Sequence, residues 1–307
     1  MEFSIIIPTK NRSAILQQSL QQALAAVRDV RVEFIIINDG TDDIRLPEVF
    51  PVQISVYKNF KSGVASARNL GAEKAVYGHL IFMDDDMWMQ PGNITALQQA
   101  IAEYPNACIN LNWIYPPALS KQIASTKFGR YLEYYGFTSL KGWNRGAPWS
   151  DTEVFETAGI TSQFLYMPKA VFAAVGGYNE NFPHAGFEDF DFAERLKKAG
   201  VKFYIQPVSS LYHNEADRVE ARSWLARKKR GGETRKYAVS FGYQQLALHY
   251  PVWKSIFYRI CIMFYPLLFA IERFWPNLPV LDKGYFQLIN LLLGVHSFEG
   301  YHKKEQQ

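Results

Sequence analysis

The sequence predicts an α/β protein with a mostly parallel central sheet, helices on both faces of that sheet, and a helical extension at the C-terminal end. Short β-branched runs alternate with helical patterns in the first part of the chain, which is typical of β-α-β units. Polar motifs directly follow three of the expected strands, at the edge where such sheets bind ligands. With 307 residues, 48% of them hydrophobic and 20% charged, the chain can bury a large core.

The alternation can be followed element by element. Ile15, Leu16, Leu20 and Leu24 recur at helical spacing between two apolar, β-branched runs. The expected order is strand 3–7, helix 15–24, strand 32–37, strand 53–57, helix 65–75, strand 79–83, a helix that includes 190–196, and strand-like runs at 201–205 and 209–212.

The three polar motifs are "PTKNR", "NDGTDD" and "DDD", which begin at Pro8, Asn38 and Asp84. Taken singly, Asn-Asp-Gly-Thr is ordinary turn chemistry, and aspartates often start a helix. The carboxyl ends of parallel strands share one edge of a sheet, so we expect the motifs to meet there. Three adjacent carboxylates repel one another unless a cation, most simply a divalent metal, lies among them.

Four segments occur in a fixed order: "SIIIPTKNR", "FIIINDGTDD", "GVASARNLGAEKAVYGHLIFMDDD" and "GGYNENFPHAGFEDFDFAERLKKAG". In content and order they resemble the family 2 glycosyltransferases, which transfer a sugar from a nucleotide-diphosphate donor and have the Rossmann-like GT-A fold. The resemblance covers about the first two thirds of the chain, and four ordered motifs are more specific than any one of them. The family often has a further Asp after the Asp-x-Asp motif, where this chain has Met87.

The resemblance implies a nucleotide site at this edge of the sheet. Asp39 would hydrogen-bond the nucleobase, and Asp84 would contact the ribose. Pro8, Thr9 and Arg12 would line the nucleotide pocket. The habit of the family favours a UDP-sugar as the donor.

The resemblance also implies a metal, Mn²⁺ or Mg²⁺, held by Asp86. Such a metal neutralises the diphosphate leaving group as the glycosidic bond breaks. Many relatives place a metal-binding histidine after the base helix and its following strand, where this chain has His213; a lone histidine is otherwise more often a packed or surface residue. An imidazole ligand would favour Mn²⁺. Arg68, in "SARNLG", either adds a fixed positive charge or forms a surface or internal ion pair.

The segment "AGFEDFDFAERLKKAG" supplies a candidate base. An acceptor hydroxyl is a sluggish nucleophile unless a group such as a carboxylate removes its proton. The resemblance assigns this role to Asp189, with Glu188 orienting the acceptor or the base. Gly177 would form a turn through which the backbone approaches the donor sugar. A single displacement then inverts the anomeric centre. The alternative is that these acids merely favour a helix N-terminus.

We expect a catalytic domain at residues 1–217 and a basic, apolar helical extension at 218–307. The basic segment 222–236 has three possible interpretations. It forms a loop that closes over the diphosphate by a hinge at Gly231-Gly232, it contacts anionic lipid, or it is a solvated helix. Two uncharged runs, 260–271 and 284–298, are shorter than the ~20 residues of a membrane-spanning helix. Their flanking basic and aromatic residues predict attachment to a membrane interface, and the alternatives are a cover for the catalytic domain or a dimer contact.

Charge and cysteine content limit the partners and the compartment. The net charge of +4 is modest and locally concentrated, so we expect no nucleic acid as partner. Cys108 and Cys261 suggest neither a zinc site nor a disulfide framework, which favours a reducing compartment. The N-terminal apolar run is too short for a signal peptide. We therefore expect a cytoplasmic protein, attached peripherally to the inner face of the cell membrane.

The expected function is inverting, metal-dependent transfer of a hexosyl or N-acetylhexosaminyl group to a saccharide or lipid-linked saccharide, in cell-surface polysaccharide or lipopolysaccharide synthesis. A haloacid-dehalogenase-like phosphotransferase also has Asp-x-Asp after a strand, but would usually show a small residue where this chain has Met87-Trp88. A non-catalytic glycan- or membrane-binding scaffold of the same fold is the other alternative. Such a scaffold would not need a catalytic base, whereas this chain keeps the acidic segment that contains Glu188 and Asp189.

Overall fold

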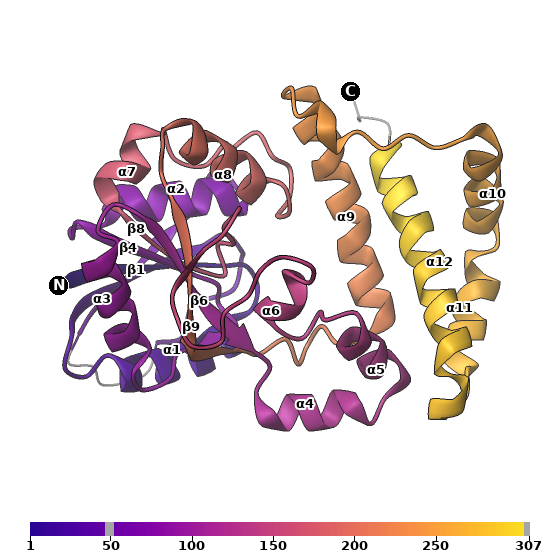
Figure 1. The fold of residues 1–307 in the computed structure, drawn as a ribbon, viewed down its shortest axis with the longest axis horizontal. Helices are drawn as coiled ribbons and strands as arrows, with labels where there is room; N and C mark the ends of the chain where they lie inside the picture. The colour runs from indigo at the N-terminus through magenta and orange to yellow at the C-terminus, as the bar shows by residue number, and fades with distance from the viewer. Residues whose placement is uncertain (47–51, 304–307) are drawn as a thin grey trace. The chain divides into compact units, whose positions relative to one another are not determined.

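The computed structural model describes residues 1–46 and 52–303, and the chain divides into two compact units (Figure 1). The first unit contains the sheet and consists of residues 1–116, 139–181 and 188–214. The second unit is helical and consists of residues 117–138, 182–187 and 215–307.

The predicted boundary at residue 217 lies close to the last junction between the units, at Asn214. The sequence interpretation had placed segments 117–138 and 182–187 in the catalytic domain, whereas the structure groups them with the C-terminal helices. The reason is packing, because Tyr131 of the first segment lies in one apolar cluster with Tyr285. Periodicity along the chain carries no information about such a long-range contact.

The first unit is built on one nine-stranded sheet with the order β3-β2-β1-β4-β8-β6-β9-β5, and β7 pairs with β9. Strands β3, β2, β1 and β4 are parallel, and β8 runs antiparallel to both β4 and β6. The predicted α/β class is confirmed, with β8 making the sheet mixed. The strands are β1 (Glu2–Thr9), β2 (Arg31–Asn38), β3 (Gln53–Lys58), β4 (His79–Met83), β5 (Met87–Trp88), β6 (Cys108–Ile114), β7 (Phe155–Glu156), β8 (Phe164–Pro168) and β9 (Phe203–His213).

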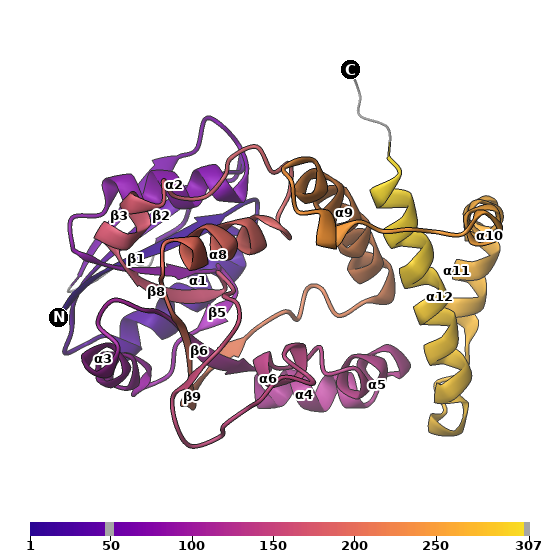
Figure 2. The same ribbon diagram turned by 45° about the horizontal axis from the view of Figure 1, so that its top comes forward.

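Helices cover both faces of this sheet, as the sequence predicted. Figures 1 and 2 show α2, α7 and α8 on one face and α1 and α3 on the other. Strands covered on both sides read as continuous apolar runs, which explains why β1 and β2 are buried along nearly their whole length. The helices of this unit are α1 (Ser13–Ala26), α2 (Val64–Lys74), α3 (Asn93–Glu103), α6 (Leu140–Trp143), α7 (Lys169–Ala174) and α8 (Glu188–Lys198).

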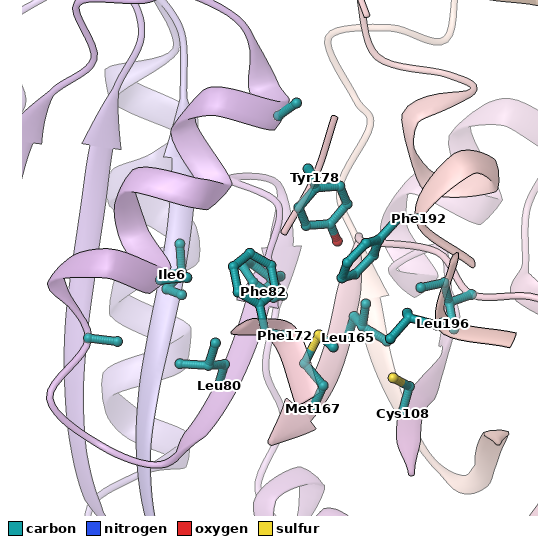
Figure 3. Packing of buried hydrophobic residues seen from close by; sticks show 14 of the residues in the cluster. Ile6, Leu80, Phe82, Cys108, Leu165, Met167, Phe172, Tyr178, Phe192 and Leu196 are labelled. Carbon is teal, nitrogen blue, oxygen red and sulfur yellow. The ribbon is translucent and has the colours of Figure 1, made fainter. Parts of the chain in front are cut away.

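The core between the sheet and the helices α2, α7 and α8 is rich in aromatic side chains (Figure 3). Phe82 of β4 meets Phe172 at a centroid distance of 5.3 Å and Tyr178 edge-on at 5.6 Å. Phe192 of α8 packs against Tyr178 with the rings tilted by 31° and a centroid distance of 4.2 Å. This packing fixes the start of α8 against the end of β4, because Phe192 and Phe82 share Tyr178 as a neighbour.

The second unit has α12 at its centre. Tyr285, Ile289, Leu292 and Val295 of this helix are fully buried, so one face of the run 284–298 forms core, while Gln287 and Asn290 are exposed. The sequence predicts a membrane interface for this run, or a cover for the catalytic domain or a dimer contact; the structure instead buries its large apolar side chains inside the helical unit. The helices are α4 (Pro117–Ala124), α5 (Lys127–Tyr134), α9 (Ala221–Ser240), α10 (Val252–Met263), α11 (Tyr265–Phe274) and α12 (Asp282–Tyr301), with two 3-10 turns at Gln244–Leu246 and Pro279–Leu281.

The basic segment 222–236 lies within α9, which continues unbroken through Gly231 and Gly232. Of the three interpretations, the hinged loop is therefore wrong, and the segment is a helix in which Trp224 is buried. Gly232 has a packing role, because a Cβ there would lie 2.6 Å from the carbonyl oxygen of Ser297 on α12. The helices α9 and α12 lie side by side in both views (Figures 1 and 2).

The two neighbouring glycines provide a matched test of this packing. Gly232→Ala should lower the free energy of unfolding by about 1–3 kcal/mol, because the added methyl group forces α9 and α12 apart. Gly231→Ala is the control, since nothing lies within 4 Å of the position of its Cβ. It should raise the free energy of unfolding by up to about 1 kcal/mol through helix propensity. Urea unfolding followed by circular dichroism measures both, and equal effects would contradict the close packing.

Candidate functional site

The polar motifs of the sequence meet at one edge of the sheet, because β2, β1 and β4 are parallel neighbours. Thr9 ends β1, Asp39 follows β2 and Asp84 follows β4. The amide of Asp39 donates to the carbonyl of Thr9 (2.8 Å), which ties the first two motifs together. Pro8 is the buried residue before Thr9 in β1.

Asp85 forms the inner part of the acidic cluster. Its carboxylate accepts a hydrogen bond from Thr9 Oγ1 (2.6 Å) and pairs with Arg12. Its carbonyl accepts from Ser19 Oγ (2.7 Å). Arg12 reaches the next acid as well, with Nη2 3.0 Å from Oδ2 of Asp86. Thr9 and Arg12, which were predicted to line the nucleotide pocket, thus hold two of the three aspartates in place.

Arg68 of α2 is the centre of a second set of contacts. Its guanidinium lies 3.1 Å from Asp84 and 3.2 Å from Glu188. The distance to Asp189 Oδ1 is 3.6 Å. The Arg68 side chain is only 4% exposed, and the Tyr178 ring faces it at 5.3 Å. The geometry therefore makes Arg68 an internal cation that joins the end of β4 to the start of α8, two motifs far apart in the sequence.

Asp189 begins α8 beside Glu188 and is held by Ser162. Its Oδ2 accepts from the Ser162 amide (3.0 Å), and its Oδ1 accepts from the Ser162 hydroxyl. The Asp189 side chain is 24% exposed, whereas that of Glu188 is 2% exposed. Asp189 is therefore partly open to solvent, while Glu188 is buried against Arg68.

Asp86 and His213, the two predicted metal ligands, lie together. His213 pairs with Met87 across β5 and β9, and the amide of Asn214 donates to the carbonyl of Asp86 (2.8 Å). This pairing places His213 Nε2 3.4 Å from Asp86 Oδ1. Trp113 packs edge-on against the imidazole at 4.8 Å.

These two side chains are compatible with a divalent metal. Within residues 1–46 and 52–303, no three His, Cys, Asp or Glu side chains gather around one point that could hold a metal. A carboxylate oxygen and an imidazole nitrogen 3.4 Å apart are nevertheless donors that Mn²⁺ accepts. They fit a metal whose remaining ligands come from the diphosphate of a bound donor.

Asp39 is held by its neighbours at the end of β2. Its Oδ1 accepts from Asn59 Nδ2 (2.7 Å) and from the Gly63 amide (2.8 Å), and its Oδ2 accepts from Lys10 Nζ (2.9 Å). The Lys10 side chain is 58% exposed. Because Lys10 is exposed, it can move away and leave Oδ2 available to a donor group of a nucleobase.

Gly177 lies in a turn with Gly176, at φ values of +67° and +77°. A Cβ on Gly177 would lie 2.6 Å from Asn69 Oδ1, so this turn packs closely on α2. The carbonyl of Gly177 accepts from Arg195 (2.7 Å), which also pairs with Asp191 (2.9 Å). In the structure this glycine serves packing, and its approach to a donor sugar stays a prediction.

Crowding changes the acidity of the aspartates. Burial, and then the charge of Asp86, raise the pKa of Asp85 to about 7 against the opposing charge of its arginine partner. Burial also raises the pKa of Asp84, with Arg68 opposing the shift and Asp86 and Asp189 adding to it. Burial dominates although 31% of the Asp84 side chain is exposed. Acids whose pKa is raised by mutual repulsion and burial are stabilised by an added cation.

Sequence reasoning missed three residues that organise this site. Asp85 was visible as the middle of three aspartates, but its partners could not be read from the motif. Ser162 is fully buried and lies in "GITSQF", which carries no recognisable signal. Arg195 follows Asp191 by four residues on α8, and this helical spacing of opposite charges could have indicated their pairing.

A protein-family model described as "Glycosyltransferase like family 2" matches residues 4–245. The chain belongs to this family. An uncharacterized glycosyltransferase of Haemophilus influenzae is 30% identical over 122 residues, which are 39% of this chain and 40% of that relative. The chondroitin synthase of Escherichia coli is 22% identical over 69% of this chain and 34% of its own length. The match thus spans two fifths or less of the length of these two relatives.

Solved structures of glycosyltransferases share the fold. The mannosyltransferase PcManGT from Pyrobaculum calidifontis, in complex with GDP-Man and Mn²⁺, aligns over 99% of this chain and 88% of its own with a TM-score of 0.56 and 11% identity. GalNAc-T7 with UDP, GalNAc and Mn²⁺ aligns over 69% of this chain and 43% of its own, with a TM-score of 0.53 and 16% identity. At these identities the likeness shows the fold, which is the GT-A type expected from the sequence.

Removing the central cation of the site should destabilise this glycosyltransferase. Arg68→Met should lower the free energy of unfolding by about 3–5 kcal/mol, because Glu188 and Asp84 lose the charge that compensates them. Lys74→Met is the control on the same helix: its ion pair with Glu73 is exposed, so the change should stay within about 0.5 kcal/mol. Urea unfolding measures both. Equal stability of the two variants would show that the buried network contributes nothing.

Proposed function

We propose that this chain is an inverting, metal-dependent glycosyltransferase that moves a sugar from a nucleotide-diphosphate donor to a hydroxyl group of a saccharide or lipid-linked saccharide. The observation that carries the proposal is the position of Arg68. It brings the acidic end of β4 and the acidic start of α8 into one site, with Asp84 at 3.1 Å and Glu188 at 3.2 Å. Such a site has a place for the leaving group beside a place for the base.

The donor side of the site lies at the ends of β1, β2 and β4. Asp39 can accept from a nucleobase through Oδ2 when Lys10 moves, and Asp84 keeps enough exposure to reach a ribose hydroxyl. A UDP-sugar carrying a hexosyl or N-acetylhexosaminyl group is the favoured donor. GalNAc-T7 was solved with UDP and PcManGT with GDP-Man, so the test must include both UDP-linked and GDP-linked sugars.

The metal would be held by Asp86 and His213. When bound, Mn²⁺ or Mg²⁺ neutralises the charge that the diphosphate gains as the glycosidic bond breaks. The chain itself holds these two metal-binding side chains in position. Arg12 holds Asp86 from one side, and the pairing of β5 with β9 holds His213 from the other.

Asp189 would act as the base. The acceptor hydroxyl attacks the anomeric carbon from the face opposite the diphosphate, its proton passes to the Asp189 carboxylate, and the bond to the diphosphate breaks. Ser162 fixes the orientation of this carboxylate with two hydrogen bonds. The single displacement inverts the anomeric centre. Glu188 acts through Arg68, as a positioning residue.

The acceptor is proposed to belong to cell-surface polysaccharide or lipopolysaccharide synthesis at the inner face of the cell membrane. The E. coli relative is named as a chondroitin synthase, that is, an enzyme of polysaccharide formation. A family match over residues 4–245 and a shared GT-A fold argue against a haloacid-dehalogenase-like phosphotransferase. A non-catalytic scaffold of the same fold is the remaining alternative. A measurement of glycosyltransferase activity decides between the enzyme and the scaffold.

A panel of nucleotide sugars tests the function without knowledge of the acceptor. UDP- and GDP-linked hexoses and N-acetylhexosamines are incubated with the protein and Mn²⁺, and slow hydrolysis and thermal stabilisation are recorded. One donor should be both hydrolysed and stabilising. A protein that hydrolyses none of them and is stabilised by none would contradict the proposal.

The metal assignment predicts a specific loss. Asp86→Ala should abolish the part of the UDP-induced rise in melting temperature that depends on Mn²⁺, because the carboxylate ligand is gone. His213→Ala should weaken the same response less completely. Asp191→Ala is the control, since that acid pairs with Arg195 away from the proposed ligands. An unchanged Mn²⁺ dependence in Asp86→Ala would disprove the assignment.

The base assignment predicts a separation of binding from transfer. Asp189→Asn keeps the shape and removes the proton acceptor, so donor binding should persist while transfer falls by ~10²-fold or more. Glu188→Gln should be milder. Glu194→Gln, on the same helix and paired with Lys197, is the control for loss of a charge. If Asp189→Asn loses donor binding, this carboxylate serves the nucleotide or metal; transfer at the wild-type rate would place the base elsewhere.

A further inference from the structure

The helices α10 and α11 of the second unit carry a long row of exposed apolar side chains. Its members recur every three or four residues and continue from one helix into the next. Both ends are open, with Trp253 68% and Phe274 78% exposed. We call this set the apolar row, and it consists of Trp253, Ile256, Ile260, Phe264, Leu267, Ile271 and Phe274.

The apolar row is not part of the core of its unit. Tyr258 and Cys261, on another side of α10, are buried in a cluster with Val295 and Phe298 of α12. Figures 1 and 2 show α10 and α11 on one side of α12 and α9 on the other. Soluble proteins seldom leave so many large apolar side chains in one patch unless the patch has a partner.

A basic pocket shares the helix α10 with this row. It has a volume of about 290 Å³ and is lined by Ile262, Glu299 and Phe298 together with the basic side chains Lys229, Arg259, His302 and Lys303. We call it the cationic pocket. Arg259 and Ile262 come from α10 itself, so the pocket and the apolar row share a helix.

The charges in the cationic pocket are only partly compensated. Lys229 pairs with Glu299, and Lys303 lies 2.9 Å from Glu233. Arg259 has no ion pair or hydrogen bond from its side chain to the residues at 1–46 and 52–303. It therefore presents a guanidinium that suits a phosphate group.

The shape of the helix pair indicates how it can meet a bilayer. In the described part of the chain no single helix is long and apolar enough to cross a membrane. Taken together, α10 and α11 are long and apolar enough, but the pair is bent by 71°. Amphipathic helices with aromatic side chains on one face and basic groups beside it lie in the plane of the membrane surface.

We propose that the apolar row inserts into the interfacial layer of a bilayer that contains anionic lipid, and that the cationic pocket binds the phosphate of an anionic headgroup there. The combination of apolar side chains with an adjacent surplus of positive charge carries this choice of partner. The proposal narrows the expected membrane contact to α10 and α11, because the second apolar run is buried in α12.

A second copy of this chain would be a poorer partner for the same surface. In a symmetric dimer formed through the apolar row, the same patch faces itself. Each copy would bring its own cationic pocket with the same helix α10, and like charges repel. An anionic membrane covers the apolar row and neutralises the pocket at the same time.

Flotation of the full chain with vesicles tests the proposal. Neutral phosphatidylcholine vesicles are compared with vesicles that also contain phosphatidylglycerol, in the absence of nucleotide and metal, so that the result is independent of the transferase activity. The protein should float with the anionic vesicles, bind the neutral ones at least about tenfold less, and be released by added salt.

Matched variants separate the apolar and the electrostatic contributions. The double variant Trp253→Asp/Phe274→Asp should lose at least about tenfold in vesicle binding, because charges enter the apolar layer. Arg259→Ala should lose about fivefold, and Arg259→Lys should lose less. Val76→Asp, at an apolar residue of the first unit that is 68% exposed, is the control and should bind like the wild type. All four changes affect exposed or surface-lining side chains, and circular dichroism checks that each variant is folded.

Three outcomes would overturn the proposal. The first is equal vesicle binding by wild type and the Trp253→Asp/Phe274→Asp variant. The second is a stable dimer in sedimentation equilibrium that this double variant abolishes, which would assign the apolar row to a second copy. The third is full release from anionic vesicles by inorganic phosphate at an ionic strength where chloride has no effect, which would make the pocket a site for free phosphate.

Discussion

One buried guanidinium holds the candidate active site together. Arg68 lies between Asp84 and Glu188, and its helix α2 packs closely against the sheet. Small residues make this approach possible: a Cβ on Gly71 would lie 2.2 Å from a methyl group of Ile6 on β1. The position of Arg68 thus depends on small residues, such as Gly71, on the face of α2 that packs against the sheet. The acidic start of α8 is in turn stabilised by that cation, and the aromatic core under it keeps α8 in register.

The three consecutive aspartates divide their tasks. Asp85 is turned inward and holds Thr9 and Arg12, so it belongs to the framework of the site. Asp84 faces Arg68, and Asp86 faces His213. The backbone turns at Asp85 and Asp86, between β4 and β5, so the three neighbouring side chains point to different sets of partners. Burial and the charge of Asp86 raise the pKa values of Asp84 and Asp85, and this favours a substrate that arrives with a cation.

The sequence predicted the parts of this structure that depend on local pattern. The strand at 79–83 has the predicted bounds, and the predicted first two strands differ from β1 and β2 by one or two residues at each end. Motifs at strand ends pointed to the residues of the site, because topology alone brings them together. Partners within the site could not be predicted, since Ser162 and the pairing of Arg68 depend on tertiary packing. The runs 260–271 and 284–298 look alike in composition, yet most large side chains of the first are exposed or half-buried, whereas Tyr285, Ile289, Leu292 and Val295 of the second are fully buried.

The chain passes between its two units at five places, after residues 116, 138, 181, 187 and 214. Such interlacing has an evolutionary consequence. A tail joined by one linker can be gained, lost or exchanged in a single recombination event, whereas a unit assembled from three separate stretches cannot. The helical unit therefore cannot be added, removed or exchanged by cutting the chain at one point.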